Sequence, residues 1–195
     1  MCGSFIAGGS IVGVSGFLLG KNFAIPDTSL KGAAGGHAAG MRRDNFTSPY
    51  KLVSSFGVPD HIEAFELSGD NMIVATSNHV FIYDRTGSLV NNFTVASNLR
   101  DIATNNEYIY LLFPSRIEVY NPEGEWIRDW EACSDQSDYC SMAIAPGALF
   151  VTDAANKNIC QYTSEGNFVR FIQSPDGFII PSYSFGVTYT GGVLY

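Results

Sequence analysis

The sequence contains few charged residues, and positively charged residues are the scarcest. Lysine and arginine together number 11, aspartate and glutamate 19, and the formal net charge is −8. Eleven cations spread along the chain form no basic stripe. This argues against nucleic acid as a partner, because binding to it depends on neutralising phosphates. The acidity is the usual solubility charge of a secreted or periplasmic domain and does not indicate a cationic ligand.

Motifs of common catalytic sites are also missing. The sequence has no nucleophile elbow, phosphate loop, dinucleotide fingerprint or HExxH motif. Glycine and aromatic residues, in contrast, are frequent, at 20 residues and 13% respectively. This mixture suits many short strands joined by tight turns, and we predict an all-β protein. A chain of 195 residues is long enough for one domain with a sizeable core.

The first twenty residues form a separate apolar segment. Residues 2–20 contain no charge and, as a helix, would roughly match the thickness of a bilayer core. Their many glycines fit a signal segment or a glycine-packed anchor better than a strongly inserting span, although no basic residue precedes the run and no convincing cleavage site follows it. The alternative is a buried segment, which so much glycine would stabilise poorly. We predict an apolar N-terminal helix in 1–20 that serves as a membrane anchor or signal segment.

The next segment, residues 21–49, consists largely of small residues with no periodic apolar face. Such a segment cannot bury enough surface to order itself, which predicts a flexible linker. An apolar segment followed by a linker predicts an exported protein, with residues 50–195 tethered to the membrane outside the cytoplasm.

Residues 50–195 repeat a pattern of about 40 residues. A tyrosine is followed four residues later by a glycine three times: Tyr83 and Gly87, Tyr120 and Gly124, Tyr162 and Gly166. A second register of apolar residues has spacings of 37, 40 and 45: Phe65, Ile102, Met142 and Val187. In the second unit, turn signals separate four apolar runs: Asp101 to Ala103, Tyr108 to Leu112, Ile117 to Tyr120 and Trp126 to Trp130. Four antiparallel strands per unit are typical of a β-propeller blade.

One unit also resembles a known family. The stretch from Leu149 to Phe171 looks like an NHL repeat at six positions: Val151, Asp153, Asn156, Ile159, Tyr162 and Gly166. The arginine of the NHL pattern is replaced by Asn158 here, but Arg116 supplies it in the preceding unit. The resemblance covers about residues 51 to 195 and implies a six-bladed type of propeller. NHL-like propellers serve as binding platforms, lyases and lactonases, so the resemblance leaves the function open.

The repeat count predicts an incomplete ring. About three and a half blades are present, and Lys51 to Phe56 matches the outer strand of a further blade whose other strands are missing. A six-bladed ring needs roughly 240 residues. We expect the chain to be a fragment of a longer protein. The alternative is that two chains complete one ring as a symmetric dimer.

Cysteines offer one structural prediction. Cys133 and Cys140 flank a polar insertion between two units, and outside the cytoplasm they can close a small ring. We predict a disulfide between them, with two thiols as the alternative. Zinc binding would need two more ligands. Cys160 occupies a strand position and is expected to be a small packing residue.

Candidate site residues are those expected at the central channel, which inner strands and their preceding loops supply. They are Asp60, His61, Glu63, Arg100, Asp101, Ser141 and Tyr183. The first three could contribute to a divalent-metal site for Ca²⁺ or Zn²⁺, resembling those of gluconolactonase-like or amidating-lyase propellers. A solvated loop looks the same in sequence.

These observations favour a non-catalytic binding or scaffolding module that needs no cofactor and takes a protein or a small polar ligand. The alternative is a metal-dependent hydrolase or lyase whose site requires blades beyond those present.

Overall fold

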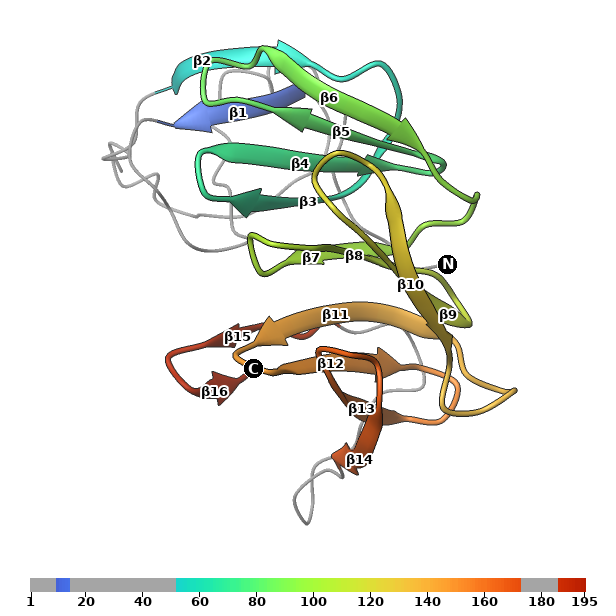
Figure 1. The fold of residues 1–195 in the computed structure, drawn as a ribbon. Coiled ribbons are helices and arrows are strands. Elements are labelled where there is room, and N and C mark those ends of the chain that lie inside the picture. Colours follow the sequence, from blue (N-terminus) through green and yellow to red (C-terminus); the bar gives the residue numbers. More distant parts are fainter. Residues whose placement is uncertain (1–9, 15–51, 173–185) are drawn as a thin grey trace, which may run out of the picture. The chain divides into compact units, whose positions relative to one another are not determined.

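The computed structural model describes residues 10–14, 52–172 and 186–195, and every regular element in these ranges is a strand (Figure 1). The chain divides into two compact units, a small one over Ser10–Gly57 and a large one that contains Val58–Tyr195. In the small unit, β1 (Ser10–Val14) pairs antiparallel with β2 (Leu52–Gly57).

The large unit contains three four-stranded antiparallel sheets, each a meander in chain order. The first sheet consists of β3 (Ile62–Ser68), β4 (Asn71–Thr76), β5 (His79–Tyr83) and β6 (Leu89–Thr94). The second consists of β7 (Asp101–Thr104), β8 (Ile109–Leu112), β9 (Arg116–Tyr120) and β10 (Trp126–Glu131). The third consists of β11 (Tyr139–Ala145), β12 (Ala148–Asp153), β13 (Asn158–Thr163) and β14 (Phe168–Ile172). A hairpin of β15 (Tyr189–Thr190) and β16 (Val193–Leu194) follows. The predicted four-stranded blades are confirmed.

The N-terminal segment was predicted to be a helix, and its described residues differ from this prediction. Ser10–Val14 is a strand and not part of a helix. Its sequence, SIVGV, is rich in β-branched residues, which favour extended backbone, and its glycine disfavours a helix. Its partner β2 overlaps Lys51 to Phe56, the segment that the sequence predicts to be the outer strand of a further blade. The remainder of 1–20 and the linker 21–49 lie outside the described residues.

Within the described residues, no helix is long and apolar enough to span a membrane.

The core lies between successive blades. All four residues of β8 are buried, and they alternate between two apolar clusters. Ile109 and Leu111 pack with residues of the first blade, whereas Tyr110 and Leu112 pack with residues of the third. Because side chains alternate along a strand, a central blade buries both of its faces.

The turn glycines also join neighbouring blades. Gly124 and Gly166 have φ of +88° and +94°. A Cβ at Gly124 would lie 2.7 Å from Cδ1 of Phe93, and one at Gly166 would lie 2.5 Å from Cδ2 of Trp130. Each turn therefore accommodates an aromatic ring from the outer strand of the preceding blade, which only glycine permits.

A polar contact recurs beside each of these rings. Asn91 on β6 donates from Nδ2 to the carbonyl oxygen of Pro122 at 3.0 Å, and Arg128 on β10 donates from Nη2 to that of Ser164 at 2.8 Å. The two donors are 37 residues apart, and each acceptor stands two residues before a turn glycine. The repeat therefore specifies contacts between blades as well as the strands within them.

Candidate functional site

Asp101 and Ser141, two of the predicted channel residues, join the inner strands of successive blades. The Asp101 carboxylate accepts hydrogen bonds from Ser141 Oγ at 2.8 Å and from the backbone N–H groups of Met142 and Ile102, each at 2.9 Å. Ser141 Oγ in turn accepts from the backbone N–H of Val187 at 3.4 Å. Position 101 thus contacts the third blade, and position 141 contacts the segment that precedes the β15–β16 hairpin.

Both side chains are buried where they make these contacts. Asp101 and Ser141 are each only 7% exposed. Their polar atoms satisfy backbone and side-chain groups that would otherwise be buried without partners. The structure assigns both residues to the packing of blades against each other.

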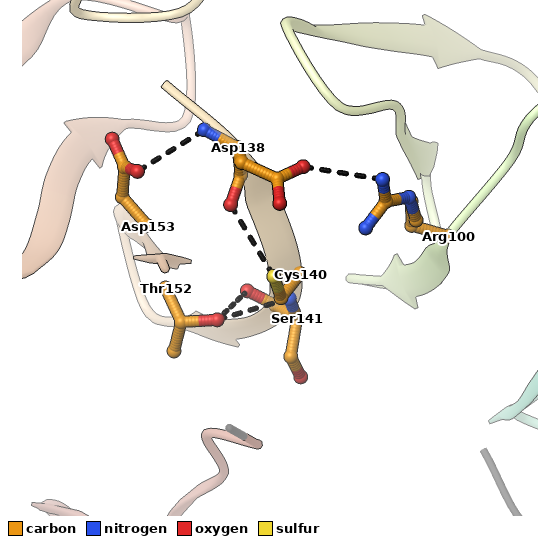
Figure 2. A network of polar contacts seen from close by, with 6 residues as sticks. All are labelled: Arg100, Asp138, Cys140, Ser141, Thr152 and Asp153. Atoms are coloured by element: carbon orange, nitrogen blue, oxygen red, sulfur yellow. Dashed lines mark hydrogen bonds and ion pairs between the residues drawn. The ribbon is translucent and has the colours of Figure 1, made fainter. Parts of the chain in front are cut away.

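Arg100 forms an ion pair across the same pair of blades. Its Nη2 lies 3.1 Å from Oδ1 of Asp138, and the side chains are 24% and 46% exposed. Figure 2 shows the network around this pair: Asp138 donates its backbone N–H to Oδ1 of Asp153 at 3.1 Å, and its carbonyl accepts from the thiol of Cys140 at 3.3 Å. The pair is the partly exposed edge of a network that continues into the buried interior of the third blade.

The predicted metal ligands lie at the beginning of the first inner strand. Asp60 and His61 are exposed, Glu63 is half-buried, and the backbone N–H of His61 donates to Oδ1 of Asp60 at 2.7 Å. Among the described residues, the only three possible metal ligands whose donor atoms lie within 4.8 Å of one another are Cys133, Asp153 and Cys160. A metal at the predicted position stays a prediction. Tyr183 lies outside the described residues.

Asp153 and Asn156, two positions of the NHL-like pattern, build the turn between β12 and β13. The Asp153 carboxylate is buried and accepts hydrogen bonds from the backbone N–H of Asn156 at 3.1 Å and from its Nδ2 at 2.9 Å. With the bond from Asp138, both carboxylate oxygens are engaged. The two residues thus match the pattern because they hold this turn and the preceding insertion together.

The cysteines are arranged differently from the prediction. Cys133 Sγ lies 2.8 Å from Sγ of Cys160, whereas the thiol of Cys140 donates to the backbone of Asp138 (Figure 2). The structure therefore brings Cys133 to the residue that sequence analysis treated as a packing residue. The reason is that the insertion folds across β13, which the spacing of residues along the chain does not reveal.

Two tyrosines surround this sulfur pair. The hydroxyl groups of Tyr139 and Tyr162 are in hydrogen-bond contact, and the backbone N–H of Cys133 donates to Oη of Tyr139 at 3.0 Å. Burial raises the pKa of Cys160, of Tyr139 and of Tyr162. The Cys160 thiol and the two tyrosine hydroxyl groups are therefore neutral near pH 7.

Sequence reasoning missed Asp138, Tyr139 and the role of Cys160. The only available signal was the spacing of 40 residues between Ile102 and Met142 instead of 37, which places an insertion here. Spacing reveals that residues are added but not what they contact.

No protein-family model matches the sequence, and no curated protein sequence matches it. Solved structures do match in fold. Virginiamycin B lyase from Staphylococcus aureus has a TM-score of 0.59 at 17% identity, covering 72% of this chain and 51% of the lyase. The β-propeller domain of Cps50 (Swd1) from Myceliophteria thermophila has a TM-score of 0.53 at 10% identity, covering 63% and 49%. The computationally designed protein Ika4 has a TM-score of 0.53 at 12% identity, covering 71% and 85%.

These likenesses define the class of fold. Together with the successive four-stranded sheets they show that the chain has a β-propeller fold. It matches about half the length of the two natural propellers described above. At such low identity the likeness concerns the fold and not the activity of these proteins.

Proposed function

We propose that this protein is a non-catalytic binding or scaffolding propeller of NHL-like type, exported and tethered to the membrane by its N-terminal segment, and that its partner is a protein. The observation that supports a protein partner most directly is a set of exposed apolar side chains at equivalent places on three outer strands. We call these side chains the rim pairs: Leu89 and Val90, Trp126 and Ile127, Phe168 and Val169.

Each rim pair occupies the beginning of an outer strand. Trp126 is 57% exposed and Val90 is 58% exposed, unlike the buried residues of the inner strands. The second member of every pair, Val90, Ile127 or Val169, coincides with a register shift between the outer strand and its neighbour. A bulge of this kind re-aims side chains and hinders pairing with a further strand.

The chemistry of the rim pairs suits a protein partner. Tryptophan and phenylalanine are enriched at the centres of protein interfaces, where they contribute large apolar areas. In contrast, a hollow of about 180 Å³ between the first and second blades is lined by Ser68, Asn71, Asn106 and apolar residues, without an acid, a base or a cysteine. The rim pairs therefore suit recognition of a protein, whereas this hollow lacks the side chains that catalysis would need.

Co-purification of the full chain in mild detergent tests this proposal. Trp126→Ala combined with Phe168→Ala should reduce recovery of the partner about ten-fold or more. Asp129→Ala, at an exposed polar position of the same strand β10, is the matched control and should leave recovery unchanged. A chain that is recovered alone, or a partner that is retained by the rim variant, would contradict the proposal.

The placement outside the cytoplasm requires a separate test. Protease added to cells from which any outer membrane has been removed should cleave the propeller, and the chain should stay with the membrane fraction after a wash with high salt. Protection from the protease until the cytoplasmic membrane is opened would contradict the proposed location.

A second candidate function is a metal-dependent hydrolase or lyase. It rests on Asp60, His61 and Glu63, which are close in sequence at the beginning of an inner strand and are not buried. Metal analysis of the full-length protein distinguishes the two functions. A stoichiometric Ca²⁺ or Zn²⁺ that is lost on changing His61 and Glu63 to Ala would contradict the scaffold and support the enzyme.

A further inference from the structure

The sulfur atoms of Cys133 and Cys160 lie closer together than a pair of metal-bound thiolates would. Their separation is 2.8 Å. Two thiolates on one tetrahedral zinc, each about 2.3 Å from the metal, would be about 3.8 Å apart. A disulfide bond is about 2.05 Å long. The sulfur pair is therefore nearer to the separation of a bonded pair than to that of two metal ligands.

Elements on both sides hold the two sulfurs in place. Cys160 is fully buried on β13, and Cys133 is half-buried in the insertion between β10 and β11. The backbone N–H of Cys133 donates to Oη of Tyr139, and this hydroxyl contacts that of Tyr162, two residues after Cys160 on β13. The insertion is thus fixed to the strand at a second point, which keeps the sulfurs adjacent.

The third member of the possible metal group is already engaged. Asp153 accepts hydrogen bonds at Oδ1 from the backbone N–H groups of Asp138 and Asn156, and at Oδ2 from Nδ2 of Asn156. A metal would have to compete for these oxygen atoms and would need both thiols ionised.

We propose that Cys133 and Cys160 form an intramolecular disulfide that fixes the insertion between the second and third blades to β13. Oxidation requires a small disulfide such as oxidised glutathione. The thiolate of the more accessible Cys133 attacks one glutathione sulfur, forms a mixed disulfide and releases the first glutathione. Cys160 loses its proton and attacks the Cys133 sulfur, and the second glutathione leaves and takes up a proton. Two protein thiols are oxidised, and one glutathione disulfide is reduced to two thiols.

The disulfide would also hold the ion pair described above. Asp138 lies five residues after Cys133 in the same insertion, and it carries the contact with Arg100. Closing the bond therefore restricts the segment that presents this pair at the beginning of the inner strands. This proposal is independent of the proposed function, because it concerns the insertion and not the rim pairs.

Peptide mapping of the full chain distinguishes the possible pairings. After equilibration with oxidised glutathione and alkylation, trypsin cleaves after Arg128, Lys157 and Arg170. Cys133 and Cys140 then share the peptide 129–157, whereas Cys160 lies in 158–170. A bond between Cys133 and Cys160 links the two peptides without reductant, and reductant separates them. A bond between Cys133 and Cys140 leaves them separate, which would overturn the proposal.

Variants identify which cysteine of the first peptide is bonded. The link should be lost in Cys133→Ser and retained in Cys140→Ser, the matched control. Its loss in Cys140→Ser alone would overturn the proposal. Alkylation of both Cys133 and Cys160 in the wild-type chain after oxidation would also overturn the proposal. This holds whether or not the reduced protein binds added zinc. In the wild-type chain, fragmentation of the linked peptide shows whether Cys140 carries the alkyl group, so the test does not depend on how well the variants fold.

Discussion

At the scale of single residues, the recurrent turn glycine meets two separate requirements. The glycine adopts positive φ, and it leaves space beside an aromatic ring of the preceding blade. The matching tyrosine takes part in the same contact, since the rings of Phe93 and Tyr120 stack with centroids 5.2 Å apart. The Tyr and Gly of the repeat thus form the contact surface for an aromatic ring of the preceding blade.

Gly124→Ala should destabilise the protein by about 2–5 kcal/mol, because it combines backbone strain with overlap against Phe93. Gly147→Ala is the matched control, since Gly147 has φ of +73° and a Cβ added there would have no other atom within 4 Å. This control should cost about 1–2 kcal/mol, from backbone strain alone. Denaturant unfolding measures both. Adding Phe93→Ala should reduce the effect of Gly124→Ala towards that of the control, and equal losses in the two glycine variants would contradict the steric explanation.

Asp101 provides a second prediction at this scale. Asp101→Ala removes the acceptor of the buried Ser141 hydroxyl and of the buried Met142 N–H, which should cost about 2–4 kcal/mol. Ser141→Ala should cost less, about 1–2 kcal/mol, because Asp101 still accepts from Met142 and only the longer bond from the Val187 N–H loses its acceptor. The free energy of unfolding from urea titrations checks this order, and a larger loss for Ser141→Ala would contradict the role assigned to Asp101.

At the scale of elements, the insertion before β11 depends on a residue of the next hairpin. Asp153 is fully buried at the end of β12 and accepts hydrogen bonds from the backbone of Asp138 in the insertion and of Asn156 in the turn. This contact connects two segments that follow different strands of one blade.

Asp153→Ala should therefore loosen both segments at once. The backbone amides of Asp138 and Asn156 should exchange hydrogen about ten-fold faster or more, because their acceptor is gone. Asp129→Ala, at an exposed position, should leave exchange at both amides unchanged. Faster exchange at Asn156 alone would show that the insertion is held by other contacts.

At the scale of the whole molecule, buried tyrosines make stability sensitive to alkaline pH. Burial, together with the hydrogen bond from its hydroxyl to Glu118, raises the pKa of Tyr120 to about 12. Burial raises the pKa of four further tyrosines: Tyr83, Tyr110, Tyr139 and Tyr162. They belong to all three blades, so their ionisation affects the unit as a whole.

The free energy of unfolding should stay level up to about pH 10 and fall as the pH rises towards 12. In the unfolded chain these tyrosines ionise near pH 10, whereas the folded chain resists ionisation, so alkali favours the unfolded state. Urea unfolding at a series of pH values measures the decrease. Tyr120→Phe should make the decrease smaller, and an unchanged slope would exclude a contribution from Tyr120.

The sequence by itself determined the repeated blades. Its prediction for the second unit agrees with the structure to within one or two residues at each strand, because alternation, turn residues and spacing are local properties of the chain. The same reasoning failed for Ser10–Val14. The length of the apolar run predicted a helix, whereas these residues form a short strand.

Only the tertiary structure decided the contacts between blades and hence the roles of individual polar residues. Asp101 and Ser141 are polar residues of the kind found in binding sites, but they form hydrogen bonds with each other and with neighbouring backbone. Cys133 meets Cys160 and not Cys140, because the insertion folds over β13. These contacts join residues that are 27 to 46 positions apart. Periodicity specifies which residues share a strand, but packing between strands decides which of them meet.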